Sequence, residues 1–92
     1  MEIVVLYFAE FKDITKIEKE KFILTESTLD NLLKLLFEKY KLKNLLWDEK
    51  IQKIHNLISI IINNQAIHEK DPSLINLKDG DTIAFLLPVS GG

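Results

Sequence analysis

The sequence contains no cysteine and no arginine, although 12 of its 92 residues are basic. Without cysteine, the chain cannot form disulfide bonds, cysteine-ligated zinc sites or a cysteine nucleophile. Without arginine, bidentate recognition of phosphate or guanine is disfavoured, because that geometry requires the guanidinium fork. The net charge of −2 likewise argues against a surface that binds nucleic acid.

Long apolar runs are also missing. No stretch reaches the ~18 apolar residues that a membrane-spanning helix needs. Met1 is not followed by the basic and then apolar segments of a secretory signal. We therefore expect a protein without a membrane segment, located in the cytoplasm.

Motifs of independent catalysis are absent as well. The sequence has no phosphate-binding loop, no glycine-rich dinucleotide loop and no nucleophile elbow. His55 and His68 stand apart from any metal-ligand spacing, so we predict no metal site. We expect no bound cofactor and no catalytic site of its own, so any reaction would depend on partner proteins.

The apolar residues that are present suffice for one small domain, since 47% of the residues are hydrophobic. The run from residue 3 to residue 9 is almost continuously apolar, which is typical of a central strand covered on both faces. Alternation places Val4, Leu6 and Phe8 on one face of that strand. Two interpretations of this face stay open: it belongs to the core, or a partner protein covers it.

The middle of the chain predicts an edge strand followed by the main helix. Residues 10–16 indicate a loop or short helical turn, and residues 17–25 an edge strand whose lysines protect its open side. Ser27 or Thr28 is a suitable N-cap. The helix that follows has one apolar stripe with steps of three and four residues: Leu29, Leu32, Leu33, Leu36, Phe37 and Tyr40.

The next part of the chain is less uniform. Residues 41–53 either continue the helix or cap the core, and both interpretations stay open. Residues 57–62 predict a buried strand, and Asn63-Asn64 a hairpin turn into a short strand at 65–68. Residues 71–73 predict a break, after which apolar side chains anchor the chain: Leu74, Ile75 and Leu77.

The last fourteen residues predict a turn at Asp79-Gly80, an apolar strand over 82–87 and a stop at Pro88. We expect a domain at 1–87 and a flexible tail at 88–92. Gly91-Gly92 makes a thin peptide that could enter a narrow channel, although a frayed end has the same composition. An ionised terminal carboxylate would need activation, for example as an acyl-adenylate, before it could react.

Residues 77–85 and the end Pro88-Val89-Ser90-Gly91-Gly92 resemble the C-terminal signature of the molybdopterin synthase small (sulfur-carrier) subunit family. Residues 5–11 resemble the first strand and turn of that family. The resemblance implies an α+β, ubiquitin-like β-grasp fold, a mixed sheet with one main helix packed across one face. Two departures are Leu87, where the family usually has a proline, and a longer stretch at 41–53.

The resemblance also implies a chemistry and its partners. An E1-like adenylating enzyme would use ATP to activate Gly92, and a sulfur donor would convert it to a thiocarboxylate. The large subunit of molybdopterin synthase, in a heterotetramer, would hold the pterin precursor that receives the sulfur. The tail that threads into it would be Pro88, Val89, Ser90 and Gly91, and the partner-binding residues would be Val4, Leu6, Phe8, Phe85 and Leu86.

Three other functions remain alternatives at this point. The protein could carry sulfur for thiamine synthesis or transfer-RNA thiolation. It could be a ubiquitin-like modifier that is joined through Gly92 to lysines of other proteins. Finally, the tail could be inert and the domain a scaffold.

Overall fold

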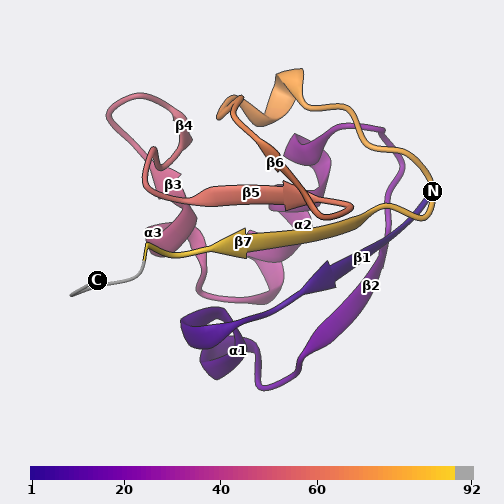
Figure 1. The fold of residues 1–92 in the computed structure, drawn as a ribbon, viewed down its shortest axis with the longest axis horizontal. Coiled ribbons are helices and arrows are strands. Elements are labelled where there is room, and N and C mark those ends of the chain that lie inside the picture. Colours follow the sequence, from indigo (N-terminus) through magenta and orange to yellow (C-terminus); the bar gives the residue numbers. More distant parts are fainter. Residues whose placement is uncertain (89–92) are drawn as a thin grey trace.

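The first and last strands lie side by side at the centre of the sheet (Figure 1). In the computed structural model, which describes residues 1–88, β1 (Glu2–Leu6) and β7 (Thr82–Leu86) run parallel. β2 (Lys19–Ile23) runs antiparallel to β1 and forms one edge of the sheet. β5 (Ser59–Ile62) and β6 (Gln65–Ile67) extend the sheet beyond β7. The strand order β2-β1-β7-β5-β6 confirms the predicted mixed sheet.

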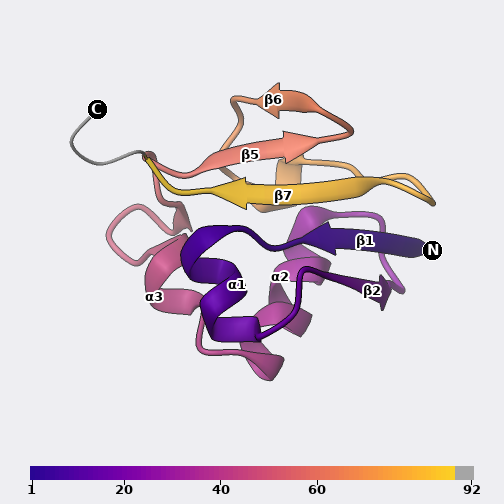
Figure 2. The same cartoon turned by 60° about the horizontal axis from the view of Figure 1, so that its bottom comes forward.

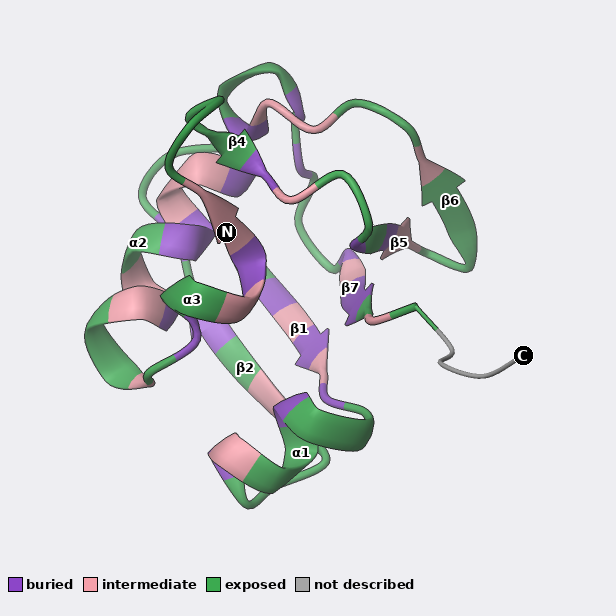
Figure 3. Ribbon diagram, turned by 90° about the vertical axis from the view of Figure 1, so that its left-hand side faces the viewer, coloured by how far each residue is buried: buried purple, intermediate pink, exposed green. Residues whose placement is uncertain are grey.

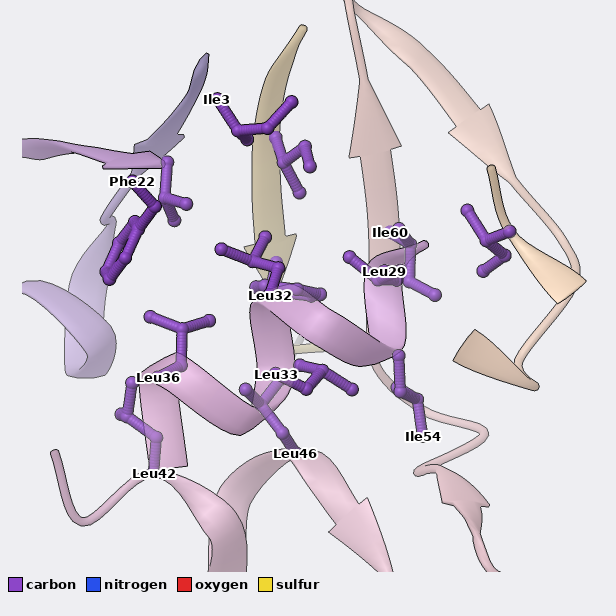
Figure 4. Packing of buried hydrophobic residues seen from close by; sticks show 14 of the residues in the cluster. Ile3, Phe22, Leu29, Leu32, Leu33, Leu36, Leu42, Leu46, Ile54 and Ile60 are labelled. Atoms are coloured by element: carbon purple, nitrogen blue, oxygen red, sulfur yellow. The ribbon is translucent and has the colours of Figure 1, made fainter. Parts of the chain in front are cut away.

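The helices gather on one side of this sheet (Figure 2). The longest, α2 (Leu29–Lys39), directs its leucine stripe at the sheet: Leu29, Leu32, Leu33 and Leu36 are all buried. Figure 4 shows these leucines facing Ile3, Phe22 and Ile60 from the strands. Thr28 occupies the N-cap position of α2, but its side chain makes no capping hydrogen bond.

The ambiguous stretch after α2 forms the short helix α3 (Lys43–Leu46) and a small hairpin of β3 (Trp47–Asp48) and β4 (Lys53–Ile54). Leu42 and Leu46 of this stretch, and Ile54 directly after it, are completely or almost completely buried in the core. The segment therefore extends the core beyond the end of α2, as the second of the two interpretations held.

Two tight turns hold the end of the sheet from which β1 begins. Asn63 and Asn64 have φ of 51° and 68°, the left-handed values that a two-residue hairpin turn requires. Gly80 has φ of 87°, a conformation that side chains with Cβ rarely adopt. The Asp79 carboxylate accepts a hydrogen bond from the Glu2 amide at 2.6 Å, and the Gly80 amide donates to the Glu2 carbonyl at 2.7 Å.

Several sequence predictions need correction. The strand predicted over residues 3–9 ends at Leu6. Residues 9–15 form the two-turn helix α1 (Ala9–Thr15), in agreement with the helical one of the two alternatives left open for residues 10–16. The helix ends because Lys16 adopts a left-handed conformation with φ of 68°. Leu74 does not anchor the chain: it is 64% exposed in the 3₁₀ turn η1 (Pro72–Leu74), whereas Ile75 and Leu77 are buried as expected.

Candidate interaction face and tail root

Within residues 1–88, the sheet has an outer face that no helix covers (Figure 2). Val4 and Leu6 of β1 are only partly buried there, and Phe8 just beyond them is 47% exposed. Their neighbours in sequence, Ile3 and Val5, are fully buried on the other face. Figure 3 shows this alternation along β1 as bands of purple and pink. An aromatic ring half exposed beside partly buried aliphatic residues is the kind of surface that protein partners cover.

β7 contributes the second row of this outer face. Because Val4 lies opposite Thr82 and Leu6 opposite Ala84, alternation places Leu86 on the outer face as well. Leu86 is 37% exposed. A hollow of about 110 Å³ on this face is lined by seven residues: Leu6, Phe8, Ile61, Asn64, Thr82, Ala84 and Leu86.

Phe85 differs from its prediction. It lies opposite Ile60 on the inner face, is only 3% exposed, and its ring centroid is 6.4 Å from that of Phe11. The reason is register, because the pairing with β1 assigns even-numbered residues of β7 to the outer face. Phe85 is therefore a core residue and not the partner-binding residue that was predicted. In β7, Thr82 and Ala84 lie on the outer face instead.

The root of the tail lies next to this face. β7 ends at Leu86 in the middle of the sheet, and Pro88 is exposed. Beside it, an open hollow of about 500 Å³ separates the end of β7 from the start of α1. It is lined by Phe8, Ala9, Glu10, Asp13, Phe85, Leu86, Leu87 and Pro88. The predicted tail residues Val89, Ser90, Gly91 and Gly92 lie outside the described residues, so their roles remain predictions.

Away from the outer face, a polar cluster links the end of β1 and the edge strand β2 to the C-terminal end of α2. The hydroxyls of Tyr7 and Tyr40 each donate to the same oxygen of Glu20, both at 2.8 Å, and the Lys39 ammonium bonds its second oxygen. The two tyrosine rings meet edge to face at 6.1 Å. This cluster could not be predicted from a sequence motif, because its members are far apart in the chain.

The cluster shifts the acidities of its members. Burial, followed by the hydrogen bond to Glu20, raises the pKa of Tyr7 well above its ordinary value. Burial by itself would raise the pKa of Glu20, but the hydrogen bonds from Lys39, Tyr7 and Tyr40 outweigh it and lower that pKa. The ionised carboxylate of Glu20 and the protonated hydroxyls of both tyrosines, the forms that make these hydrogen bonds, are therefore stabilised further by the shifted pKa values.

Within residues 1–88, no three histidine, aspartate or glutamate side chains come together as a metal site would require. In the same part of the chain, no helix has the length and apolar character to cross a membrane.

Comparison with solved structures identifies the class of this fold. SAMP1 from Haloferax volcanii superposes with a TM-score of 0.82 over all of both chains, and at 18% identity this likeness shows the fold alone. Small archaeal modifier protein 1 from Methanosarcina acetivorans is 31% identical, with a TM-score of 0.77 over 99% of this chain and 96% of that one. The fold is the predicted ubiquitin-like β-grasp.

Another similar structure was solved as a complex of two protein subunits. In the complex of subunits 1 and 2 of molybdopterin-converting factor from Helicobacter pylori 26695, one chain is 30% identical, with a TM-score of 0.64 over all of both chains. Residues 5–92 of the sequence match the ThiS family. The chain therefore belongs to the ThiS family of ubiquitin-like sulfur carriers.

Proposed function

We propose that this protein is the sulfur-carrying small subunit of a cytoplasmic molybdopterin synthase. The observation that carries the proposal is the place in the fold where the segment ending in Gly-Gly begins. The sequence Pro88-Val89-Ser90-Gly91-Gly92 follows a strand that is central in the sheet, and an uncovered apolar face lies at its root. A rigid root beside a docking face is what delivery of a tail to a second active site requires.

The proposed cycle begins with activation of the Gly92 carboxylate by an E1-like enzyme. A carboxylate oxygen attacks the α-phosphorus of ATP, pyrophosphate leaves, and an acyl-adenylate forms. A sulfur donor at the oxidation level of sulfide then attacks the carbonyl carbon and AMP leaves, so that a thiocarboxylate remains. Adenylation is needed because a free terminal carboxylate is ionised at neutral pH, and an ionised carboxylate is a poor acyl donor.

In the second half of the cycle, the large subunit covers the outer face and receives the tail. Phe8 and Leu86 supply the exposed apolar contacts, and Val4 and Leu6 support them. The terminal sulfur attacks a carbon of the pterin precursor in the large subunit and displaces an oxygen substituent, which leaves and takes up a proton. Water then cleaves the bond between that sulfur and the Gly92 carbonyl carbon, which restores the carboxylate and leaves the sulfur on the pterin. Two such transfers, one from each of two carrier molecules, supply the two sulfurs of the dithiolene. The complex reported for the Helicobacter pylori protein supports a partner of this kind.

A second function is favoured by a specific observation. The protein from Methanosarcina acetivorans, described as a small archaeal modifier, is 31% identical over almost the whole chain. By that likeness, Gly92 would be joined to lysines of other proteins after the same adenylation step. Sulfur carriage for thiamine synthesis or transfer-RNA thiolation would also use that step.

Reconstitution separates these functions. The protein is prepared with a C-terminal thiocarboxylate, verified by intact mass, and mixed with a molybdopterin synthase large subunit and the pterin precursor. The matched controls are the same chain with its ordinary carboxylate and a chain without Gly92. We expect dithiolene product only from the thiocarboxylate form.

Absence of product, with the large subunit shown to be active with another carrier, would reject the assignment to molybdopterin synthesis. Lysine-linked conjugates in cell extract that disappear when Gly92 is deleted would instead support the modifier function.

A further inference from the structure

The apolar outer face is bordered by charges of opposite sign on its two sides. Phe8 separates the two sides, because it lines both of the hollows that flank it. On the side of the tail root, the hollow is lined by Glu10 and Asp13 and by no basic residue. On the side of the edge strand, the second hollow is lined by Lys12, Glu18 and Lys19.

The charges on the tail side are not neutralised by the chain's own lysines. Within residues 1–88, Glu10 and Asp13 take part in no ion pair, and both are exposed. Two carboxylates thus stand beside Leu86 and Pro88, at the point where the tail leaves the sheet.

On the other side, an excess of positive charge remains after the local ion pairs are counted. Lys12 pairs with Glu18 at 3.0 Å and Lys21 with Glu2 at 3.5 Å. Lys19 forms no ion pair with the described residues, and it lies opposite Leu6 in the sheet. Because the side chain of Lys21 is 70% exposed, it can still turn toward a partner.

We propose that this polarity sets the orientation in which the large subunit docks. The partner surface that fits has an apolar centre over Phe8, a basic side chain beside Glu10 and Asp13, and an acidic side chain beside Lys19 and Lys21. A partner rotated by half a turn would meet like charges on both sides, which costs binding energy and slows encounter. The inference rests on the proposed function, since it assigns a partner to that docking face.

Orientation matters for this protein because of where the tail begins. Under the proposed function, the residues that follow Pro88 carry the sulfur into the partner's active site. They enter it only if the root is placed at the correct side of the interface. The acidic pair beside the root supplies that placement.

The test uses three charge-reversed carriers with the complete chain. In E10K/D13K the tail side becomes basic, and in K19E/K21E the edge side becomes acidic. The four-residue swap, which combines them, restores the wild-type net charge of −2, because two reversals in each direction cancel. The matched control E26K/E38K changes the net charge as E10K/D13K does, at exposed positions that line neither hollow.

The measurement is the association rate with the captured molybdopterin synthase large subunit, in about 0.1 M and about 1 M salt, after thermal melting has shown each carrier to be folded. Between these salts the Debye length falls from roughly 10 Å to 3 Å. At the lower salt we expect the four-residue swap to associate about tenfold more slowly than wild type, and the control to stay within about twofold. At the higher salt the difference should largely vanish.

Three outcomes would overturn the inference in distinguishable ways. If the wild-type carrier does not bind the large subunit, both the inference and the proposed function fail. If wild type binds and the swap associates equally fast, the charges do not orient the complex, and the proposed function stands. If the carrier alone forms a dimer that E10K/D13K dissociates, the occupant of the face is a second copy of this chain.

Discussion

The two faces of the sheet consist of similar residues but have different surroundings. The inner face, with Ile3, Val5 and Ile83, is fully buried under α2. The outer face alternates with it along the same strands, yet Phe8 and Leu86 keep 47% and 37% of their surface exposed. Hydrophobicity therefore does not distinguish the residues that hold the fold together from those available to a partner. The position of a single helix does.

The largest effect should come from truncating the inner face. Leu36→Ala removes a completely buried side chain from α2, and we expect the free energy of unfolding to fall by about 2–5 kcal/mol. Urea denaturation measures this directly. The matched control is Leu74→Ala, the same change at a side chain that is 64% exposed, which should cost under about 0.5 kcal/mol. Equal losses in the two variants would contradict the assignment of the core.

Truncating the outer face should show the opposite pattern. Phe8→Ala should leave the free energy of unfolding within about 1 kcal/mol of wild type. Under the proposed function, it should also weaken binding to the large subunit by about 2 kcal/mol, because aromatic residues often anchor protein interfaces. Isothermal titration calorimetry gives the dissociation constant. Phe37→Ala, on α2 away from the face, is the control for binding. A Phe8→Ala carrier that binds as tightly as wild type would show that the outer face is not the docking surface.

A smaller effect is expected where the polar cluster holds α2 against the strands. Glu20→Gln replaces the carboxylate that accepts from Tyr7, Tyr40 and Lys39, and should lower the free energy of unfolding by about 1–3 kcal/mol at pH 7.

The pH dependence of that loss has a definite sign. Because folding lowers the pKa of Glu20 below its ordinary value of 4.5, its contribution is complete above that value. It disappears as the pH falls through the lower folded-state pKa. Urea denaturation between pH 7 and pH 3 should therefore show the wild-type and Glu20→Gln curves converging in acid. A difference that stays constant over this range would show that the ionised form of Glu20 is not what matters.

Local patterns in the sequence sufficed to predict most of the fold. The leucine stripe of α2 and the turn at Asn63-Asn64 depend on residues within a few positions of each other, so spacing and backbone preference identify them. The alternation of β1 likewise placed Val4, Leu6 and Phe8 on one face, and in the structure these three residues are less buried than Ile3 and Val5 on the other face.

The features that could not be predicted depend on pairing between distant segments. In β7 nearly every residue is apolar, so both faces look alike in the sequence, and only the register with β1 places Phe85 in the core. The cluster around Glu20 joins residues that lie 13 to 20 positions apart, and local spacing in the sequence does not predict such contacts. The charges beside the tail root were missed for the same reason, since Glu10 and Asp13 approach Leu86 only in the folded molecule.

The central position of β7 also has a consequence for the order of events during translation. β1 is made first, but its parallel neighbour consists of residues 82–86, so a nascent chain that ends before them leaves β1 and β5 without the strand that joins them. Pairing between such distant segments is slow to form, because a long loop must close first. A chain terminated before residue 82 would thus lack both the central strand β7 and the Gly-Gly end. Under the proposed function, an activating enzyme would meet that end only on chains that contain all strands of the sheet.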